Sequence, residues 1–100
     1  MNYIIEFEVQ AIIDIEHIGD YIEYNLYAPQ AARDLYNGII GEIDKLENIA
    51  HSFAVSTSKS VLLYGENARR INYHHYAIIY TIDNPYVIIH RIVHGSLIID

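Results

Sequence analysis

Residues 76–94 read YAIIYTIDNPYVIIHRIVH and decide the fold of this chain. The run is rich in β-branched and aromatic residues, and it is interrupted once, by Asp83-Asn84-Pro85. Such side chains favour strands, whereas the Asp-Asn-Pro triplet favours a compact turn. The stretch therefore predicts a β-hairpin of two long strands, Tyr76–Ile82 and Tyr86–His94.

Shorter segments extend this hairpin into an antiparallel sheet. Val61–Tyr64 has the composition of a strand that ends at Gly65, and Arg69–Asn72 continues as strand or turn before the hairpin. Gly95 breaks the last strand, and Leu97–Ile99 is apolar enough to resume it. We therefore expect a meander of three or four antiparallel strands.

The first half of the chain predicts one strand and two helices. Residues 3–8 are β-branched and aromatic and predict a short strand. Two apolar series with a helical period follow it: Ile12, Ile15, Ile18, Ile22 and Leu26, and then Ala32, Leu35, Ile39, Ile43 and Leu46. Pro29 lies between the two series and suits the first turn of the second helix. A link this short makes the two helices an antiparallel hairpin.

Together these elements define an α+β fold in a single domain that spans residues 1–100. A chain of 100 residues is long enough for one hydrophobic core and no more. The antiparallel meander needs a cover on one face, and the helical hairpin is the cover that the sequence offers.

The composition indicates the cellular compartment in which the protein acts. No apolar stretch approaches the ~20 residues that a membrane span needs, because charges interrupt every run. The first residues have neither a basic region nor an apolar core of a secretory signal, and the chain has no cysteine. We therefore expect a cytoplasmic protein that does not bind a membrane.

Charge is distributed unevenly along the chain, whose formal net charge is −7. Residues 1–50 hold ten acidic residues against Arg33 and Lys45, whereas residues 51–100 hold four basic residues against three acidic ones. A polyanionic partner would therefore bind to the second half of the chain. For the first half, the simpler interpretation is a solvated acidic helical surface.

The histidines do not predict a metal site. His74 and His75 are adjacent and point to opposite faces of an extended segment. His90 and His94 share a face of a regular strand but lie roughly 13 Å apart along it. No cysteine completes a zinc site, so we expect neither a metal nor another cofactor, and we expect the histidines on the outer face of the sheet.

Four basic residues on the meander, Arg69, Arg70, Arg91 and His94, are the candidate functional residues. A metal-free ribonuclease needs a base, an acid and a cation around one phosphate, and histidine with arginine could supply them. Arg69 and Arg70 face opposite ways in a strand, so only one of them could join such a group. The alternative is that one arginine pairs with an acid on the helices and the other is solvated.

Tyrosines are unusually frequent, with ten in the chain. Tyr73, Tyr76, Tyr80 and Tyr86 gather on the predicted hairpin, where they could stack on bases or anchor a protein partner. Tyrosine is also a good strand residue, and that explanation is the simpler one.

The order of these elements, with several short motifs, resembles the RelE/ParE superfamily of bacterial toxins, also called plasmid-stabilisation proteins. The resemblance runs from Tyr3 to about Gly95. The motifs are Ala11-x-x-Asp14-Ile15-x-x-Ile18-x-x-Tyr21-Ile22, Ala28-Pro29-x-Ala31-Ala32, Arg69-Arg70-Ile71, Tyr76-Ala77-Ile78-Ile79-Tyr80 and Ile92-Val93-His94-Gly95.

The resemblance implies the toxin of a type II toxin–antitoxin module, with a cognate antitoxin as partner. RelE-like and YoeB-like members cut mRNA on the ribosome, whereas ParE-like members inhibit DNA gyrase and thereby growth. Ribonuclease members typically carry an arginine where this chain has Ala77, and a basic residue where it has Ser96. These departures and the acidic net charge favour the ParE branch, with Arg69, Arg70, Arg91 and His94 as candidate target contacts.

Two other functions stay open at this point. One is a metal-independent, ribosome-dependent mRNA endonuclease that uses Arg69 or Arg70 with His94. The other is an inactivated toxin that serves as an antitoxin-binding protein. Either a homodimer or a hetero-oligomer with the antitoxin is compatible with the sequence.

Overall fold

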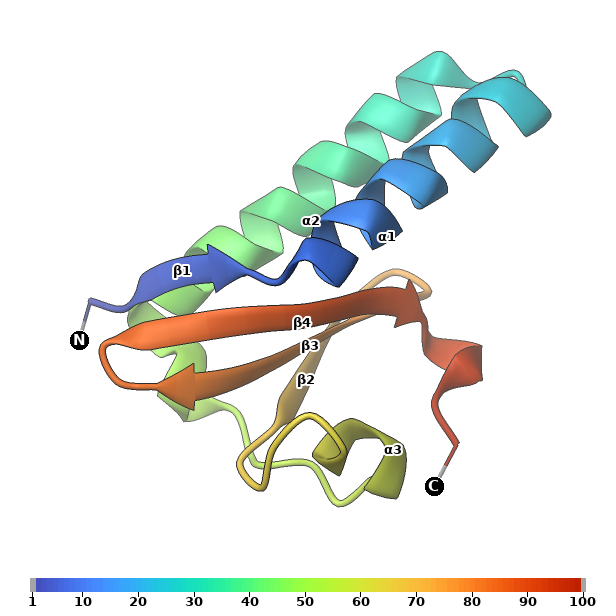
Figure 1. The fold of residues 1–100 in the computed structure, drawn as a ribbon. Helices are drawn as coiled ribbons and strands as arrows, with labels where there is room; N and C mark the ends of the chain where they lie inside the picture. Colours follow the sequence, from blue (N-terminus) through green and yellow to red (C-terminus); the bar gives the residue numbers. More distant parts are fainter. Residues whose placement is uncertain (1, 100) are drawn as a thin grey trace.

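The computed structural model describes residues 2–99 and contains a four-stranded sheet in the order β1-β4-β3-β2. The strands β3 (Tyr76–Asp83) and β4 (Tyr86–His94) form the expected hairpin. The strand β2 (Arg69–Tyr73) pairs with β3 in the antiparallel sense, which completes the meander (Figure 1). The predicted α+β fold is confirmed.

The first strand joins the same sheet from the other side. The strand β1 (Ile4–Phe7) is parallel to β4 and pairs with Tyr86–Ile89. Parallel neighbours need a long crossover, and the helical hairpin between them supplies it. Because β1 is short, it pairs with only the first half of β4 and leaves the second half of that edge to a helix.

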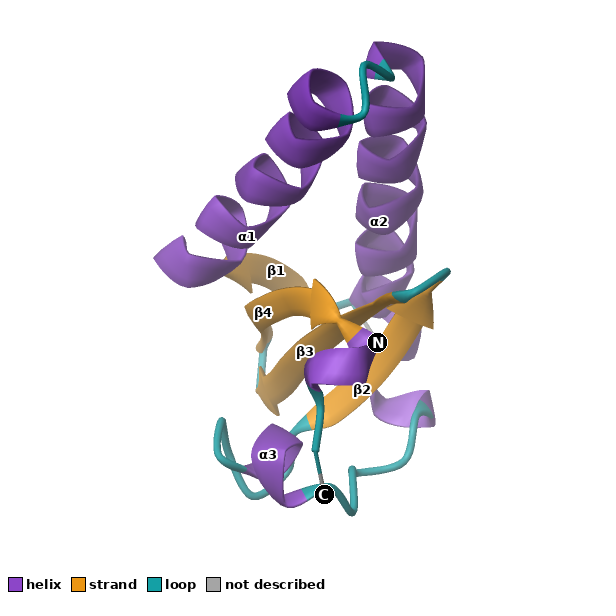
Figure 2. Ribbon diagram, turned by 90° about the vertical axis from the view of Figure 1, so that its right-hand side faces the viewer, coloured by secondary structure: helices purple, strands orange, loops and turns teal. Residues whose placement is uncertain are grey.

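The helical hairpin covers one face of the sheet, as the sequence predicts. Helix α1 (Val9–Asp20) continues into a π-helical turn, η1 (Tyr21–Asn25), and α2 (Pro29–Ile49) returns antiparallel to it. Pro29 begins α2, where its missing N–H costs nothing. Figure 2 shows the two helices joined at the tip and spread apart toward the sheet. None of the helices within residues 2–99 is long and apolar enough to cross a membrane.

The buried face of α1 differs from the predicted stripe. Ala11 and Asp14 are buried on it, while Ile12 and Leu26 are exposed. Two physical causes account for the difference. Helix α1 lies against the edge of β4 and presents a carboxylate to it, and the π turn changes the helical phase before Leu26.

The main core lies between α2 and the sheet. Ile39, Ile43 and Leu46 on successive turns of α2 are fully buried, as their spacing predicts. They pack in one cluster with sheet residues on the facing side, among them Ile78, Tyr80, Ile89 and Ile92.

A smaller cluster covers the second face of the sheet. The short helix α3 (Lys59–Leu62) and the 3₁₀ turn η3 (Gly95–Leu97) lie on this side, and Val61 and Ile98 pack with Ile79. The predicted strands Val61–Tyr64 and Leu97–Ile99 were therefore wrong. Ser58 caps α3 by accepting a hydrogen bond from the Val61 amide (3.5 Å), and burial of Val61 outweighs its preference for strands.

A β-bulge interrupts the regular alternation of β4. Tyr80 pairs with Ile89 and Ile79 pairs with Arg91, so His90 is an extra residue on β4. The bulge puts His90 and Arg91 on the same face, although neighbours in a regular strand face opposite ways. It leaves Ile89 and Ile92 on the core side of the sheet.

A glycine on α2 sets how closely that helix approaches β2. The ring of Tyr73 lies over Gly38, and a Cβ at Gly38 would fall 2.0 Å from the Tyr73 Cζ atom. At Gly41, one turn further along, a Cβ would meet nothing within 4 Å.

We therefore expect opposite effects from the same substitution at two neighbouring glycines. Gly38→Ala should lower the free energy of unfolding by about 1–3 kcal/mol, because the Tyr73 ring must move out of its place. Gly41→Ala should raise it by about 0.5–1 kcal/mol, because alanine is the better helix former. Urea denaturation of both variants measures this, and a shift of both in the same direction would contradict the described packing.

Candidate functional site

The four basic residues of the meander do not form one cluster. Arg70 pairs across the sheet with Ile79, and Ile79 pairs with Arg91, so these two arginines share the second face. Arg69 is one residue away and lies on the opposite, helix-covered face, where its Nε donates to the Phe53 carbonyl (2.8 Å). The predicted opposition of Arg69 and Arg70 is borne out by this register.

Arg91 is held by an acid of the helical hairpin. Its Nε and Nη2 atoms donate to the two carboxylate oxygens of Asp14, at 2.7 and 3.1 Å. The backbone N–H of Ile92 donates to the same carboxylate (2.9 Å), at the part of the β4 edge that β1 leaves open. The arginine that pairs with an acid on the helices is thus Arg91. The sequence suggests Arg69 or Arg70 for this pairing, but neither makes an ion pair within residues 2–99.

The protonation of Asp14 follows from these bonds. Burial is the largest influence on its pKa and raises it. The hydrogen bonds from Arg91, from the Ile92 amide and from Gln10 together outweigh burial, so the pKa lies below the ordinary value of 3.8. The same pair raises the pKa of Arg91. Asp14 is therefore ionised at neutral pH and makes a structural ion pair.

His94 lies at the end of β4 beside the β2–β3 turn. Its Nδ1 accepts a hydrogen bond from the Ser96 amide (3.2 Å) and contacts the Ser96 hydroxyl (2.6 Å). A neutral ring with an accepting Nδ1 carries its proton on Nε2. The ring stacks on His75, with centroids 5.8 Å apart. This leaves an imidazole N–H donor at the surface.

Arg70 approaches the same corner from the second face. A Cβ at Gly95 would fall 3.3 Å from the Arg70 Nη2 atom, so the absence of a side chain at Gly95 lets the guanidinium lie close to the backbone. His94 pairs with Tyr76, and Tyr76 and Arg70 lie on opposite faces of the sheet by the strand register. The structure therefore brings Arg70 and His94 to one corner but onto different faces.

His90 lies on the second face of the sheet, which the helical hairpin does not cover, as expected, but it is buried there. Its Nδ1 lies 2.7 Å from a Glu8 carboxylate oxygen and its Nε2 lies 2.7 Å from the Thr81 hydroxyl. A carboxylate, an imidazole and a hydroxyl in sequence are the arrangement of an activated nucleophile. Thr81 is itself buried, however, and neither of the two cavities described below reaches it. The three groups therefore form a structural bridge between the β1–α1 junction, β3 and β4.

His74, His75 and Tyr80 are the other two histidines and the buried tyrosine of the meander. His74 and His75 form the turn between β2 and β3 and are not in an extended segment. Within residues 2–99 no three histidine or acidic side chains gather as metal ligands. Tyr80 is buried and donates to the Ala50 carbonyl (2.7 Å), and burial raises its pKa to about 12, so it cannot serve as a surface anchor.

Two of the cavities at the surface of residues 2–99 bear on function. The smaller, about 180 Å³, lies on the second face between α3, the sheet and the η3 segment, with Tyr64 and Arg91 in its wall. The larger, about 410 Å³, is a groove between the two helices of the hairpin. Its size lies within the range that ligand and partner sites usually have.

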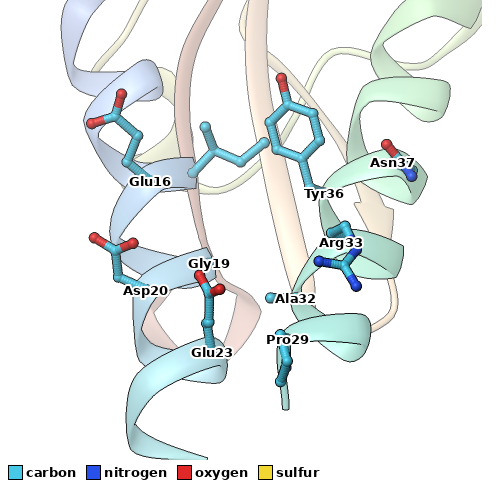
Figure 3. Close-up of a pocket in the computed structure, with 10 residues that line it drawn as sticks. Glu16, Gly19, Asp20, Glu23, Pro29, Ala32, Arg33, Tyr36 and Asn37 are labelled. Atoms are coloured by element: carbon cyan, nitrogen blue, oxygen red, sulfur yellow. The ribbon is translucent and has the colours of Figure 1, made fainter. Parts of the chain in front are cut away.

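The walls of the groove differ in charge. Figure 3 shows Glu16, Asp20 and Glu23 along the α1 and η1 side of the groove, opposite Arg33 and Tyr36 of α2. The Glu23 carboxylate points toward α2, whereas those of Glu16 and Asp20 point outward at the rim. Ten residues line it: Ile15, Glu16, Gly19, Asp20, Glu23, Pro29, Ala32, Arg33, Tyr36 and Asn37. Small residues at Gly19 and Ala32 leave the groove open, because glycine has no side chain and alanine has only a methyl group. The result is an apolar groove with one acidic wall.

Sequence reasoning missed both Asp14 and this groove. A signal for Asp14 was present, since an acid stands among Ala11, Ile15 and Ile18 at the spacing of the buried face. The groove had no comparable signal, because it depends on how far apart the two helices lie.

The comparisons with known proteins agree with this fold. The family profile described as the ParE toxin of the type II toxin–antitoxin system, parDE, matches residues 5–98. Among solved structures, a chain of the chromosomal ParDE toxin–antitoxin system from P. aeruginosa superimposes with a TM-score of 0.77. The two chains are 17% identical, and the match covers 92% of this chain and 95% of the other. No curated protein matches the sequence.

The fold and the profile together define a toxin of a type II toxin–antitoxin system. The chain belongs to the ParE toxin family. This confirms the resemblance to the RelE/ParE superfamily and the assignment to its ParE branch.

The Asp14 ion pair predicts a specific dependence of stability on pH. The folded-state pKa of Asp14 is lowered. The contribution of Asp14 to the free energy of unfolding is therefore complete at pH values above its ordinary pKa of 3.8, and it is lost as the pH falls through the folded-state pKa. Asp14→Asn should lower the free energy of unfolding at pH 7 by about 2–3 kcal/mol and flatten its decline below pH 4. Urea titrations at pH 3, 4, 5 and 7 measure this, with Asp34→Asn, an exposed acid of α2, as the control. Parallel pH profiles for Asp14→Asn and the wild type would contradict the assignment.

Proposed function

We propose that this chain is a ParE-type toxin that arrests growth by binding DNA gyrase in the cytoplasm, and that a cognate antitoxin neutralises it. The observation that carries the proposal is the match of the ParE toxin profile to residues 5–98. The target follows from the family resemblance, in which ParE-like members act on gyrase and RelE-like members act on mRNA.

The arrangement of the meander supports binding over RNA cleavage. Metal-free cleavage needs a base, an acid and a cation around one phosphate. Arg70 and His94 lie on different faces of the sheet, and Arg91 already holds Asp14. Ala77, at the position where ribonuclease members typically carry an arginine, is buried in the sheet. The net charge of −7 also disfavours contact with a phosphate backbone.

Arg70 and His94 are the proposed target contacts on the meander. Arg70 bonds only to Asn72 on its own strand (3.0 Å), and His94 bonds only to Ser96, among the hydrogen bonds of residues 2–99. The side chains of Arg69 and Arg91 already donate hydrogen bonds to the Phe53 carbonyl and to Asp14, respectively. These two arginines are therefore weaker candidates for contact with the target.

The groove between α1 and α2 is the proposed antitoxin site. A partner helix that lays its apolar side into a groove is a common mode of recognition, and Ile15, Ala32 and Tyr36 supply the apolar surface here. The acidic wall of Glu16, Asp20 and Glu23 calls for basic residues on the partner. The antitoxin segment should therefore be apolar on one side and basic at its edge.

Induction of the chain in a bacterial host tests the proposed target. We expect growth arrest, a DNA-damage response and mRNA that stays intact by primer extension. Co-expression of the protein encoded by the adjoining reading frame should restore growth. Cleavage of mRNA at codon-linked sites would contradict the proposal in favour of the endonuclease, and the absence of arrest would favour an inactivated toxin.

The same assay tests the proposed contact residues. Arg70→Gln should weaken growth arrest at equal protein level, because it removes a guanidinium that makes no ion pair within residues 2–99. Lys59→Gln is the matched control, since it removes an exposed cation from α3. Equal loss of arrest in both variants would assign the effect to net charge and not to Arg70.

A further inference from the structure

The tip of the helical hairpin exposes large apolar and aromatic side chains. Tyr21, Tyr24, Leu26 and Tyr27, here called the tip patch, are 55%, 66%, 55% and 88% exposed. No hydrogen bond of their side chains is present within residues 2–99, and more than half of each residue's surface is open to solvent. Clustered exposed aromatic residues are typical of protein–protein contact surfaces.

Tyr27 is held in an unfavourable backbone conformation. Its φ is +53°, in the left-handed region that disfavours residues with a Cβ. The position follows the end of a helical turn, where glycine is the usual residue. The other left-handed non-glycine residue of the described chain, His74, lies in a tight hairpin turn whose twist requires positive φ. The helix end accounts for the positive φ of Tyr27, because the Ala28 amide bonds back to the Ile22 carbonyl (3.1 Å) around it. It does not account for a tyrosine at this position, where glycine would serve without strain.

The turn that leads into Tyr27 is also irregular. The Leu26 amide bonds to the Tyr21 carbonyl five residues earlier (3.3 Å), which makes η1 a π-helical turn. Isolated π turns often occur at functional sites, and a strained tyrosine where glycine would serve suggests a use for its exposed side chain. Two separate departures from regular geometry therefore meet at the tip patch.

The tip patch continues the proposed antitoxin groove. Glu23, which lines the groove, lies in the same π turn as Tyr21 and Tyr24, and Asp20 directly precedes it. A partner that occupies the groove with basic residues toward this wall would meet the tip patch at the end of its path. The same carboxylates disfavour an acidic partner or an anionic membrane here.

We propose that the tip patch anchors the antitoxin, through a basic and apolar segment that extends out of the groove, and that Tyr27 is kept in its strained conformation for this contact. The inference rests on the proposed function. It adds a prediction that the groove alone does not make, namely that removing Tyr27 stabilises the free protein and weakens the complex.

The test uses Tyr27→Gly in the full chain, with the protein encoded by the adjoining reading frame as the probe. We expect the Tm of the free chain to rise by about 2–5 °C, because glycine accepts positive φ without strain. We expect the affinity, measured by calorimetry, to fall at least about tenfold, as for an aromatic anchor. Gly19→Phe, which fills the groove, should also weaken binding, whereas Gly41→Phe, on the exposed side of α2, should not.

The outcomes separate this inference from the proposed function. If Tyr27→Gly binds within about twofold of the wild type while Gly19→Phe binds weakly, the proposed role of the tip patch is wrong. The proposed role of the groove as the antitoxin site then remains supported. A lower Tm for Tyr27→Gly would overturn the argument from strain. If Tyr27→Gly binds the probe normally but no longer arrests growth, the patch serves the target and the proposed occupant is wrong. No binding by the wild-type chain would overturn the antitoxin proposal as well.

Discussion

A buried carboxylate joins the helical hairpin to the sheet, and the rest of the structure depends on it. Asp14 accepts hydrogen bonds from Arg91, from the Ile92 amide and from Gln10. The Ile92 amide belongs to an edge that would otherwise be unpaired, because β1 ends opposite Ile89. The carboxylate thus replaces a missing strand partner and sets where α1 lies. With α1 fixed there and α2 packed by Ile39, Ile43 and Leu46, the spread of the two helices is fixed as well.

Much of the fold could be predicted because its signals are local. The β-branched and aromatic composition of residues 76–94 and their Asp-Asn-Pro turn predict the β-hairpin, and the apolar period of α2 predicts its buried face. The short segments failed where tertiary contacts outweigh local preference. Val61 has the side chain of a strand residue, yet the Ser58 cap and burial against Ile79 make it helical. Likewise, the bulge at His90 comes from pairing with β3 and cannot be read from β4 alone.

The candidate site was less predictable than the fold, for the same reason. The sequence identified the basic residues of the meander but could not say which of them an acid would hold, since Asp14 and Arg91 lie 77 residues apart. Neither the groove nor the strained Tyr27 has a signature in composition or period. Both arise where the two helices meet, which is a property of packing and not of either helix.

The two halves of the molecule therefore have distinct proposed tasks, with the antitoxin on the acidic hairpin and the target on the meander. Chemical-shift mapping of the ¹⁵N-labelled chain with the antitoxin tests this division most directly. The account predicts that the perturbed amides gather along residues 15–37, across the groove and the tip, with β2 and the end of β4 unchanged. Perturbations confined to the corner of Arg70 and His94, with the hairpin unchanged, would contradict it.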